Sequence, residues 1–273
     1  MSNHIKEILD RNLSRYNREE FIEFDPVQIP HRFSKKEDIE IAGFLAATIA
    51  WGQRKSIINN ALKLMNLMDF SPLEFLQNEA PDYNNLTAET DLFSLSGSSS
   101  WQSFRGFCHR TFNSEDCLYF LLSLKRIYAE RGGLEEVFTQ GFEEDKTIFS
   151  AIRYFRKEFL SLPHLHRVEK HIPNVDEKSA AKRINMFLRW MVRKDDLSVD
   201  FGLWKKIPAS ALMLPLDVHS GNISRQLGLL KSDKNDWAAV CEVTNRLREL
   251  DPEDPVKYDF ALFGAGVFAD RDI

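Results

Sequence analysis

Apolar residues recur at helical spacing along most of the chain. The first clear apolar face consists of Ile39, Phe44, Leu45 and Ile49, and the second consists of Ile57, Ile58, Leu62 and Met65. Ser34 and Glu37 have the spacing of a capping box, which predicts that the first of these helices begins at Ser34. Gly52 separates the two faces, so we expect two successive helices here.

The same period continues to the end of the chain. Ser114 is placed to cap a helix over 115–131, which Gly132 and Gly133 end. Further helical periods fit 146–159, 178–192, 219–227, 236–250 and 255–268. Residues 77–100 are rich in Ser, Asn and Thr, which predicts a loop. With no alternating strand pattern of useful length, the sequence predicts an all-α protein of about ten helices.

Composition places the chain among folded globular proteins. Its 273 residues are 43% hydrophobic and 28% charged, which is enough for one large domain or two small lobes. The uncharged apolar run 41–52 is too short to cross a bilayer, which requires about 20 residues. The N-terminus is polar and lacks an apolar signal segment, so we expect a cytoplasmic protein without membrane contact.

Cysteine usage and glycine motifs exclude several kinds of chemistry. The cysteines, Cys108, Cys117 and Cys241, form no close pair, which argues against a disulfide scaffold and a C-x-x-C metal knuckle. No glycine-rich phosphate loop is present, so nucleotide chemistry is not expected. We therefore expect no cofactor.

Charge is distributed unevenly along the chain. The net charge is −5, but residues 178–206 contain eight basic side chains and only three acidic ones. This window therefore has a local net charge of +5. A basic face on an acidic protein predicts one-sided docking on a phosphate backbone.

Two segments carry the candidate chemistry. The first, Ile172–Ala180, reads IPNVDEKSA and leads into an amphipathic helix; the second, Pro215–Leu229, begins PLDVHSGNISR. The pair resembles the helix-hairpin-helix DNA glycosylase superfamily, which contains endonuclease III and the 8-oxoguanine glycosylases. In that family a hairpin of the form L-P-G-V-G-x-K-T-A precedes a segment with a catalytic aspartate. Weaker similarity at 44–53 and 257–266 extends the resemblance over most of residues 35–268.

The resemblance implies a fold and a domain organisation. It implies a two-lobed helical helix-hairpin-helix fold over residues 1–273 as a single unit, with the hairpin and catalytic region at about 163–229. Asn174 and Asp176 replace the hairpin glycines, and both residue types tolerate a left-handed backbone. The separation of Lys178 from Asp217, 39 residues, is longer than in endonuclease III and resembles the archaeal 8-oxoguanine glycosylases. The overall amino-acid sequence also resembles a bacterial family without an assigned activity.

The resemblance also implies catalytic residues. Lys178 aligns with the family's nucleophilic lysine, and we place it at a helix N-terminus, where the helix dipole favours a neutral amine. Lys182, one turn further along, is the alternative nucleophile. Asp217 is expected to deprotonate the amine and to balance positive charge at the sugar, although Asp before a helix is also a common N-cap.

Further residues are expected to contact DNA. The predicted DNA-binding residues are Asn174, Val175, Asp176, Arg183, Trp51, Gln53, His219 and Arg225. Trp51 is placed to stack on an extruded base, with a role as a core aromatic residue as the alternative.

The resulting functional prediction is base excision. We expect a monomeric DNA glycosylase and abasic-site lyase that acts on double-stranded DNA, with 8-oxoguanine as the best single candidate base. The alternatives are a non-catalytic nucleic-acid-binding protein on the same fold and a metal hydrolase that uses His164, His166 and His171, whose spacing is a weak ligand set. No cysteine follows Cys241, so the iron–sulfur cluster of endonuclease III is not expected.

Overall fold

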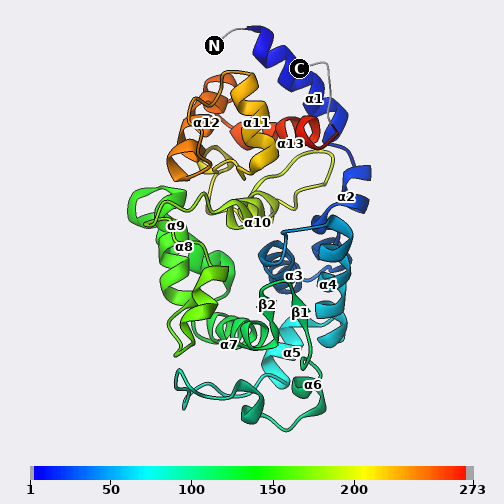
Figure 1. Ribbon diagram of the computed structural model, residues 1–273, viewed down its shortest axis with the longest axis vertical. Coiled ribbons are helices and arrows are strands. Elements are labelled where there is room, and N and C mark those ends of the chain that lie inside the picture. The colour runs from blue at the N-terminus through cyan, green and yellow to red at the C-terminus, as the bar shows by residue number, and fades with distance from the viewer. Residues whose placement is uncertain (1–2, 269–273) are drawn as a thin grey trace. The chain divides into compact units, whose positions relative to one another are not determined.

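The computed structural model describes residues 3–268, and most of the chain is helical (Figure 1). Helices account for 62% of the chain and strands for 2%, which confirms the predicted all-α class. The chain divides into two compact units, each assembled from separate segments. Unit 1 contains residues 1–24, 146–149 and 174–273, and unit 2 contains residues 25–145 and 150–173.

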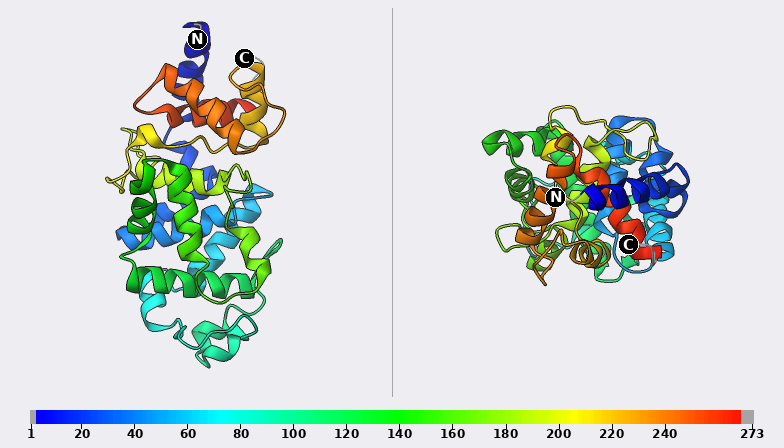
Figure 2. Two further views of the ribbon diagram at one scale, coloured as in Figure 1. Left: turned by 90° about the vertical axis from the view of Figure 1, so that its left-hand side faces the viewer. Right: turned by 90° about the horizontal axis from the view of Figure 1, so that it is seen from above.

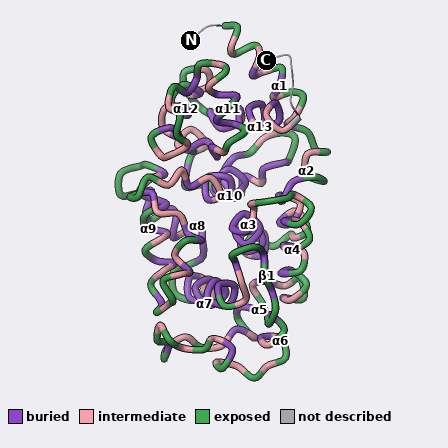
Figure 3. The backbone as a smooth tube through the Cα atoms, in the orientation of Figure 1, coloured by how far each residue is buried: buried purple, intermediate pink, exposed green. Residues whose placement is uncertain are grey.

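Unit 2 is a helical layer around an aromatic core. Its α-helices are α3 (Lys36–Thr48), α4 (Arg54–Leu67), α5 (Pro72–Asn78), α6 (Ser99–Gln102), α7 (Ser114–Glu130), α8 (Leu134–Asp145) and most of α9 (Ile148–Phe159). Short 3₁₀ turns cover Pro26–Gln28, Pro30–Arg32, Leu92–Leu95 and His166–His171. α3 is buried from Asp38 to Thr48, and most of α7 between Asp116 and Ile127 is buried as well (Figure 3). Phe44 packs against Phe120 and Phe155, with ring centroids 5.9 and 5.5 Å apart, so apolar packing joins α3, α7 and α9.

Unit 1 contains the N-terminal and C-terminal helices. Its elements are α1 (Asn3–Tyr16), α2 (Glu20–Phe24), α10 (Lys182–Val192), α11 (Val218–Gln226), α12 (Trp237–Leu250) and α13 (Asp259–Phe268), with 3₁₀ turns at Ala209–Ala211 and Pro255–Tyr258. α1 and α11 both pack against α13, as the two views of Figure 2 also show for α1. Gly264 lies against the Tyr16 ring so closely that an added Cβ would be 2.3 Å from it, so a side chain there would force α1 away.

The predicted apolar faces are confirmed in large part. Ile39, Phe44, Leu45 and Ile49 are all buried, and so are Ile57 and Met65 of the second face. Ile58 and Leu62 are half-buried. The glycine stop after α7 is also confirmed: Gly132 and Gly133 both have positive φ, and the amide of Gly133 donates to the Ile127 carbonyl over 3.2 Å.

Two predicted helix caps are wrong. α3 begins at Lys36, its N-cap is Lys35, and no side chain caps it, so Ser34 and Glu37 form no capping box. α7 begins at Ser114 itself, and its N-cap is Asn113, which forms a capping box with Asp116. Both errors are one or two residues, the usual uncertainty of a helix end.

Other elements were not predicted. α8 covers the acidic segment 134–145, whose apolar positions Val137, Phe138 and Phe142 are buried. A short antiparallel hairpin pairs β1 (Cys108–His109) with β2 (Phe112–Asn113). Strands of two residues are too short to show an alternating pattern, which explains why the sequence does not predict them. The predicted loop 77–100 is interrupted only by the end of α5, a 3₁₀ turn and the start of α6.

No helix within residues 3–268 has the length and apolar character needed to span a membrane.

Candidate active site

The segment that resembles the hairpin forms a compact turn. The Asn174 carbonyl accepts from the Ser179 amide over 3.1 Å, and the Val175 carbonyl accepts from the Lys178 amide over 3.0 Å. The Asn174 side chain accepts from the Asp176 amide over 3.2 Å. Val175 is buried, whereas Asp176 and Lys178 are exposed. The turn is therefore closed by its own backbone and anchored by one apolar side chain.

The left-handed residues of this turn differ from the prediction. We expected Asn174 and Asp176 to replace the hairpin glycines in a left-handed conformation. The residues with positive φ are instead Lys178, at +67°, and Ala181, at +49°. Because left-handed residues interrupt a right-handed helix, the chain cannot become helical before Lys182.

This backbone changes which lysine begins the helix. The prediction of a helix from Lys178 is wrong: α10 begins at Lys182, and Lys178 lies in the preceding turn. The Lys178 carbonyl accepts from the Trp237 amide over 3.0 Å, which joins the turn to the first turn of α12. Lys182 is half-buried, and its Nζ lies 3.4 Å from the Met186 Sδ on the same face of α10.

Asp217 is the N-cap of α11. Its Oδ1 accepts from the Ser220 amide over 3.0 Å and from the Ser220 hydroxyl over 3.2 Å, and the Ser220 hydroxyl in turn accepts from the Asp217 amide. Within residues 3–268, the hydrogen bonds of this carboxylate all end on Oδ1. The cap therefore fixes the side chain and leaves Oδ2 for another partner.

Asp259 is a third ionisable side chain of unit 1, and its charge is coupled to those of Lys182 and Asp217. Asp259 begins α13, is only 6% exposed and forms an ion pair with Arg189 of α10. Burial raises the pKa of the Asp259 carboxyl to about 6. The charges of Arg189 and Lys182 act to lower this pKa, whereas the charge of Asp217 acts to raise it.

Much of the basic window is internal, which corrects the predicted basic face. Arg189 and Arg193 are both 3% exposed. Arg193 forms ion pairs with Asp195 at 2.6 Å, Asp200 at 3.0 Å and Asp254 at 2.8 Å. Arg183 and Lys182 are half-buried. The exposed basic side chains of the window are Lys178, Lys194, Lys205 and Lys206. Part of the positive charge counted in the sequence therefore stabilises the interior of unit 1.

The two other predicted residues near Asp217 have different environments. His219 is exposed in the first turn of α11, with its ring edge-on to Phe263 at 6.3 Å. The Arg225 guanidinium donates to the Ser232 and Lys234 carbonyls and, over 2.6 Å, to Asn235 Oδ1. Arg225 thus holds the loop before α12, while His219 faces solvent beside Asp217.

Trp51 and Gln53 belong to unit 2, whereas the other predicted site residues belong to unit 1. Trp51 is half-buried, stacked on His171 with a centroid separation of 6.0 Å and edge-on to His109 at 5.3 Å. Gln53 is exposed and is the N-cap of α4. Trp51 is therefore packed on one side while part of its surface stays accessible.

Of the three histidines considered as metal ligands, His164 and His166 share the partner Glu169, whereas His171 has Asp116. His171 is buried and lies 3.2 Å from Asp116, while the exposed His166 lies 2.9 Å from Glu169. His164 lies 2.7 Å from the Leu162 carbonyl. In the described part of the chain, no three Asp, Glu, His or Cys side chains are grouped to hold a metal ion.

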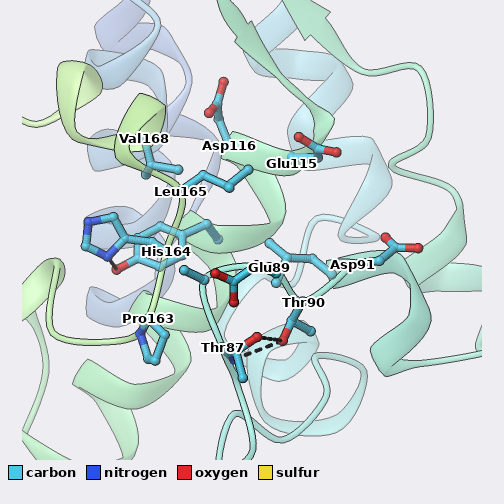
Figure 4. A pocket seen from close by; sticks show the side chains of 13 residues that line it. Thr87, Glu89, Thr90, Asp91, Glu115, Asp116, Pro163, His164, Leu165 and Val168 are labelled. Carbon is cyan, nitrogen blue, oxygen red and sulfur yellow. Dashed lines mark hydrogen bonds between the residues drawn. The ribbon is translucent and has the colours of Figure 1, made fainter.

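Unit 2 also contains a cavity of about 220 Å³ (Figure 4). Its wall comes from the loop 87–92, the first turns of α7 and residues 163–168. The labelled side chains include Glu89, Asp91 and Glu115, with His164 and Leu165 on the opposite wall. None of the residues predicted for the glycosylase site lines this cavity, whereas His164, a residue of the metal-hydrolase alternative, does.

Comparison with known proteins identifies a family. Residues 25–268 match DUF2400, a family described as a protein of unknown function. The chain belongs to the DUF2400 family. No curated protein and no solved structure matches the chain. For this DUF2400 protein, functional inference therefore depends on the chemistry of the residues in unit 1.

Asp259 and Arg189 are the residues of this site that sequence reasoning missed. Asp259 opens the apolar run FALFGAG, and an acidic residue at the start of such a buried helix is a detectable signal. Arg189 was counted as part of the basic window, and only the fold shows that it faces a carboxylate.

Proposed function

We propose that this DUF2400 protein is a DNA glycosylase and abasic-site lyase with Lys182 as the nucleophile and Asp217 as its activating carboxylate. The observation that carries this proposal is that Lys182 begins α10, Asp217 caps α11 and Asp259 begins α13, and that these helices are held together by the Arg189–Asp259 ion pair and by the packing of α11 on α13. The mostly helical fold is consistent with the helix-hairpin-helix glycosylase fold that the two segments resemble.

Three features favour Lys182 over Lys178 as the nucleophile. Lys182 is the first residue of α10, so its side chain extends from a fixed helical backbone. It is half-buried, whereas Lys178 is exposed in the turn. Its charge also acts on Asp259, on which the charge of Asp217 acts as well. The alignment with the family motif favours Lys178, so the two lysines make different predictions.

The chemistry uses the amine and the carboxylate in one sequence. Asp217 Oδ2 takes a proton from the Lys182 ammonium, and the Nζ lone pair attacks the sugar C1′. The bond from C1′ to the base breaks, and its electron pair leaves with the base, which takes up a proton. Opening of the sugar ring then gives an iminium at C1′, and loss of the C2′ proton expels the 3′-phosphate. Water finally releases the lysine from the cleaved strand.

The substrate assigned by this proposal is double-stranded DNA with a damaged or abasic site. The exposed Lys178, Lys194, Lys205 and Lys206 supply positive charge on unit 1 for phosphate contacts. An oxidised purine such as 8-oxoguanine is the proposed base, by resemblance to the archaeal glycosylases.

Borohydride trapping tests the proposal. On a duplex with one abasic site, Nζ adds to the C1′ aldehyde, water leaves, and borohydride reduces the iminium to a stable secondary amine. We expect wild-type protein and Lys178→Ala to give the covalent adduct and Lys182→Ala to give none. A complete absence of adduct on abasic and 8-oxoguanine duplexes, with binding retained, would overturn the proposal in favour of a non-catalytic DNA-binding protein.

A further inference from the structure

Asp259 is a buried charge that the proposed chemistry does not use. A buried carboxylate costs several kcal/mol unless it is paired and hydrogen-bonded. Asp259 Oδ2 accepts from Arg189 Nη1, and the guanidinium carbon of Arg189 lies 4.2 Å from the centroid of the Phe260 ring. The pair is thus enclosed between α10 and α13, where an apolar pair would fit the interior at lower cost.

The geometry of α10 directs Lys182 toward this pair. Lys182, Met186 and Arg189 follow one another at intervals of four and three residues, which places them on the same face of the helix. Since Lys182 Nζ lies 3.4 Å from Met186 Sδ, the lysine side chain extends along the helix in the direction of Arg189.

Asp217 is connected to the same place through α11. The first turn of α11 touches α13 directly: a Cβ added to Gly266 would lie 3.0 Å from the His219 carbonyl oxygen. The His219 ring also meets Phe263 one turn after Asp259. Helix α11, which begins after Asp217, therefore packs on α13, which begins at Asp259.

We infer that Asp259, held by Arg189, is a positioning residue that keeps the Lys182 amine directed at Asp217 and the reacting sugar. This inference rests on the proposed function. The charged groups that act on Asp259 are Arg189 and Lys182 of α10, Asp217 of α11, and Asp200. The negative charge of Asp259 attracts the Lys182 ammonium before proton transfer. This attraction limits the rotamers of the long Lys182 side chain, many of which would place the amine out of position for attack.

Single-turnover trapping as a function of pH tests the inference. The rate of borohydride adduct formation on an abasic duplex is measured from pH 5.5 to pH 9 for wild type and Asp259→Asn. We expect the variant to react about tenfold more slowly on its plateau, because the amine is less well placed. We also expect its rate to reach half-maximum at a lower pH, because one negative charge near the ammonium is gone.

Two further variants separate positioning from folding. Asp254→Asn removes another carboxylate of unit 1, one that pairs with Arg193 and not with Arg189, and should keep the wild-type pH midpoint. Asp259→Glu keeps the negative charge and should also keep that midpoint, at a reduced rate.

These measurements distinguish failure of the inference about Asp259 from failure of the proposed function. If wild-type protein forms no adduct, the proposed function itself fails. If wild type forms the adduct and Asp259→Asn matches it in rate and midpoint, the role of Asp259 is refuted. The inference also fails if Asp254→Asn or Asp259→Glu moves the midpoint as far as Asp259→Asn does.

Discussion

At the scale of single residues, two left-handed backbone conformations decide the arrangement of the site. Lys178 and Ala181 both have positive φ, and neither is a residue type that favours it. Together they delay the helix to Lys182 and leave Lys178 in an exposed turn. The identity of the proposed nucleophile thus depends on backbone conformation as much as on the lysines themselves.

A glycine at position 178 tests this conformation. A non-glycine residue in the left-handed region costs about 1–2 kcal/mol. Glycine removes this cost, but part of the stabilisation is offset because glycine has greater conformational freedom in the unfolded chain. We expect Lys178→Gly to raise the free energy of unfolding by about 0.5 kcal/mol in urea titrations. The neighbouring exposed Glu177, which has no positive φ, is the matched control: Glu177→Gly should lower the free energy of unfolding. Equal destabilisation by both changes would contradict the left-handed assignment.

The sequence could predict the residues of the site better than their conformation. The motif placed Lys178 and Asp217 in the candidate site, with Lys182 as the alternative lysine one turn along, because residue types and spacing are visible in a sequence. It misplaced the left-handed positions, at Asn174 and Asp176, because propensity is weaker than the tertiary contacts that fix this turn, such as the bond from the Trp237 amide to the Lys178 carbonyl. Asp259 was missed because its partner Arg189 is 70 residues away.

Among the helices, α11 begins with a side chain that has a structural role as its N-cap and a proposed chemical role. Asp217 caps the helix through Oδ1 and keeps Oδ2 for the proposed proton transfer. The helices over 219–227, 236–250 and 255–268 could be predicted from the sequence because periodic apolar faces and capping residues are local signals. α8 escaped prediction because its acidic residues obscure a short apolar face.

Two substitutions at position 217 separate these roles. Asn is as good an N-cap as Asp, so Asp217→Asn should change the free energy of unfolding by less than about 0.5 kcal/mol while abolishing excision. Asp217→Ala should abolish excision and also lower the free energy of unfolding by about 1 kcal/mol. Urea unfolding and single-turnover excision measure the two effects. Full excision activity in Asp217→Asn would show that the carboxylate is only a cap.

At the scale of the whole molecule, buried charge makes stability depend on pH. Unit 1 encloses Arg189, Arg193, Asp200 and Asp259. For Asp259 the folded pKa, about 6, lies above the ordinary value of 3.8, so the folded state binds its proton more tightly than the unfolded state. Its contribution to stability is therefore complete below pH 4 and is lost as pH rises through about 6.

This term can be isolated by comparing wild type with Asp259→Asn, which has no proton to lose. We expect the free energy of unfolding of the variant, relative to wild type, to increase by about 3 kcal/mol between pH 4 and pH 7. Urea unfolding at several pH values measures the difference. A difference that stays constant over this range, or that decreases, would contradict the raised pKa of Asp259.

In the proposed reaction, Lys182 forms the covalent bond to DNA. The most direct measurement is peptide mapping of the borohydride-reduced adduct by mass spectrometry, using wild-type protein and an abasic duplex. We expect the sugar remnant to lie on the Lys182 side chain and Lys178 to stay unmodified. A remnant on Lys178, or on any lysine outside α10, would contradict it.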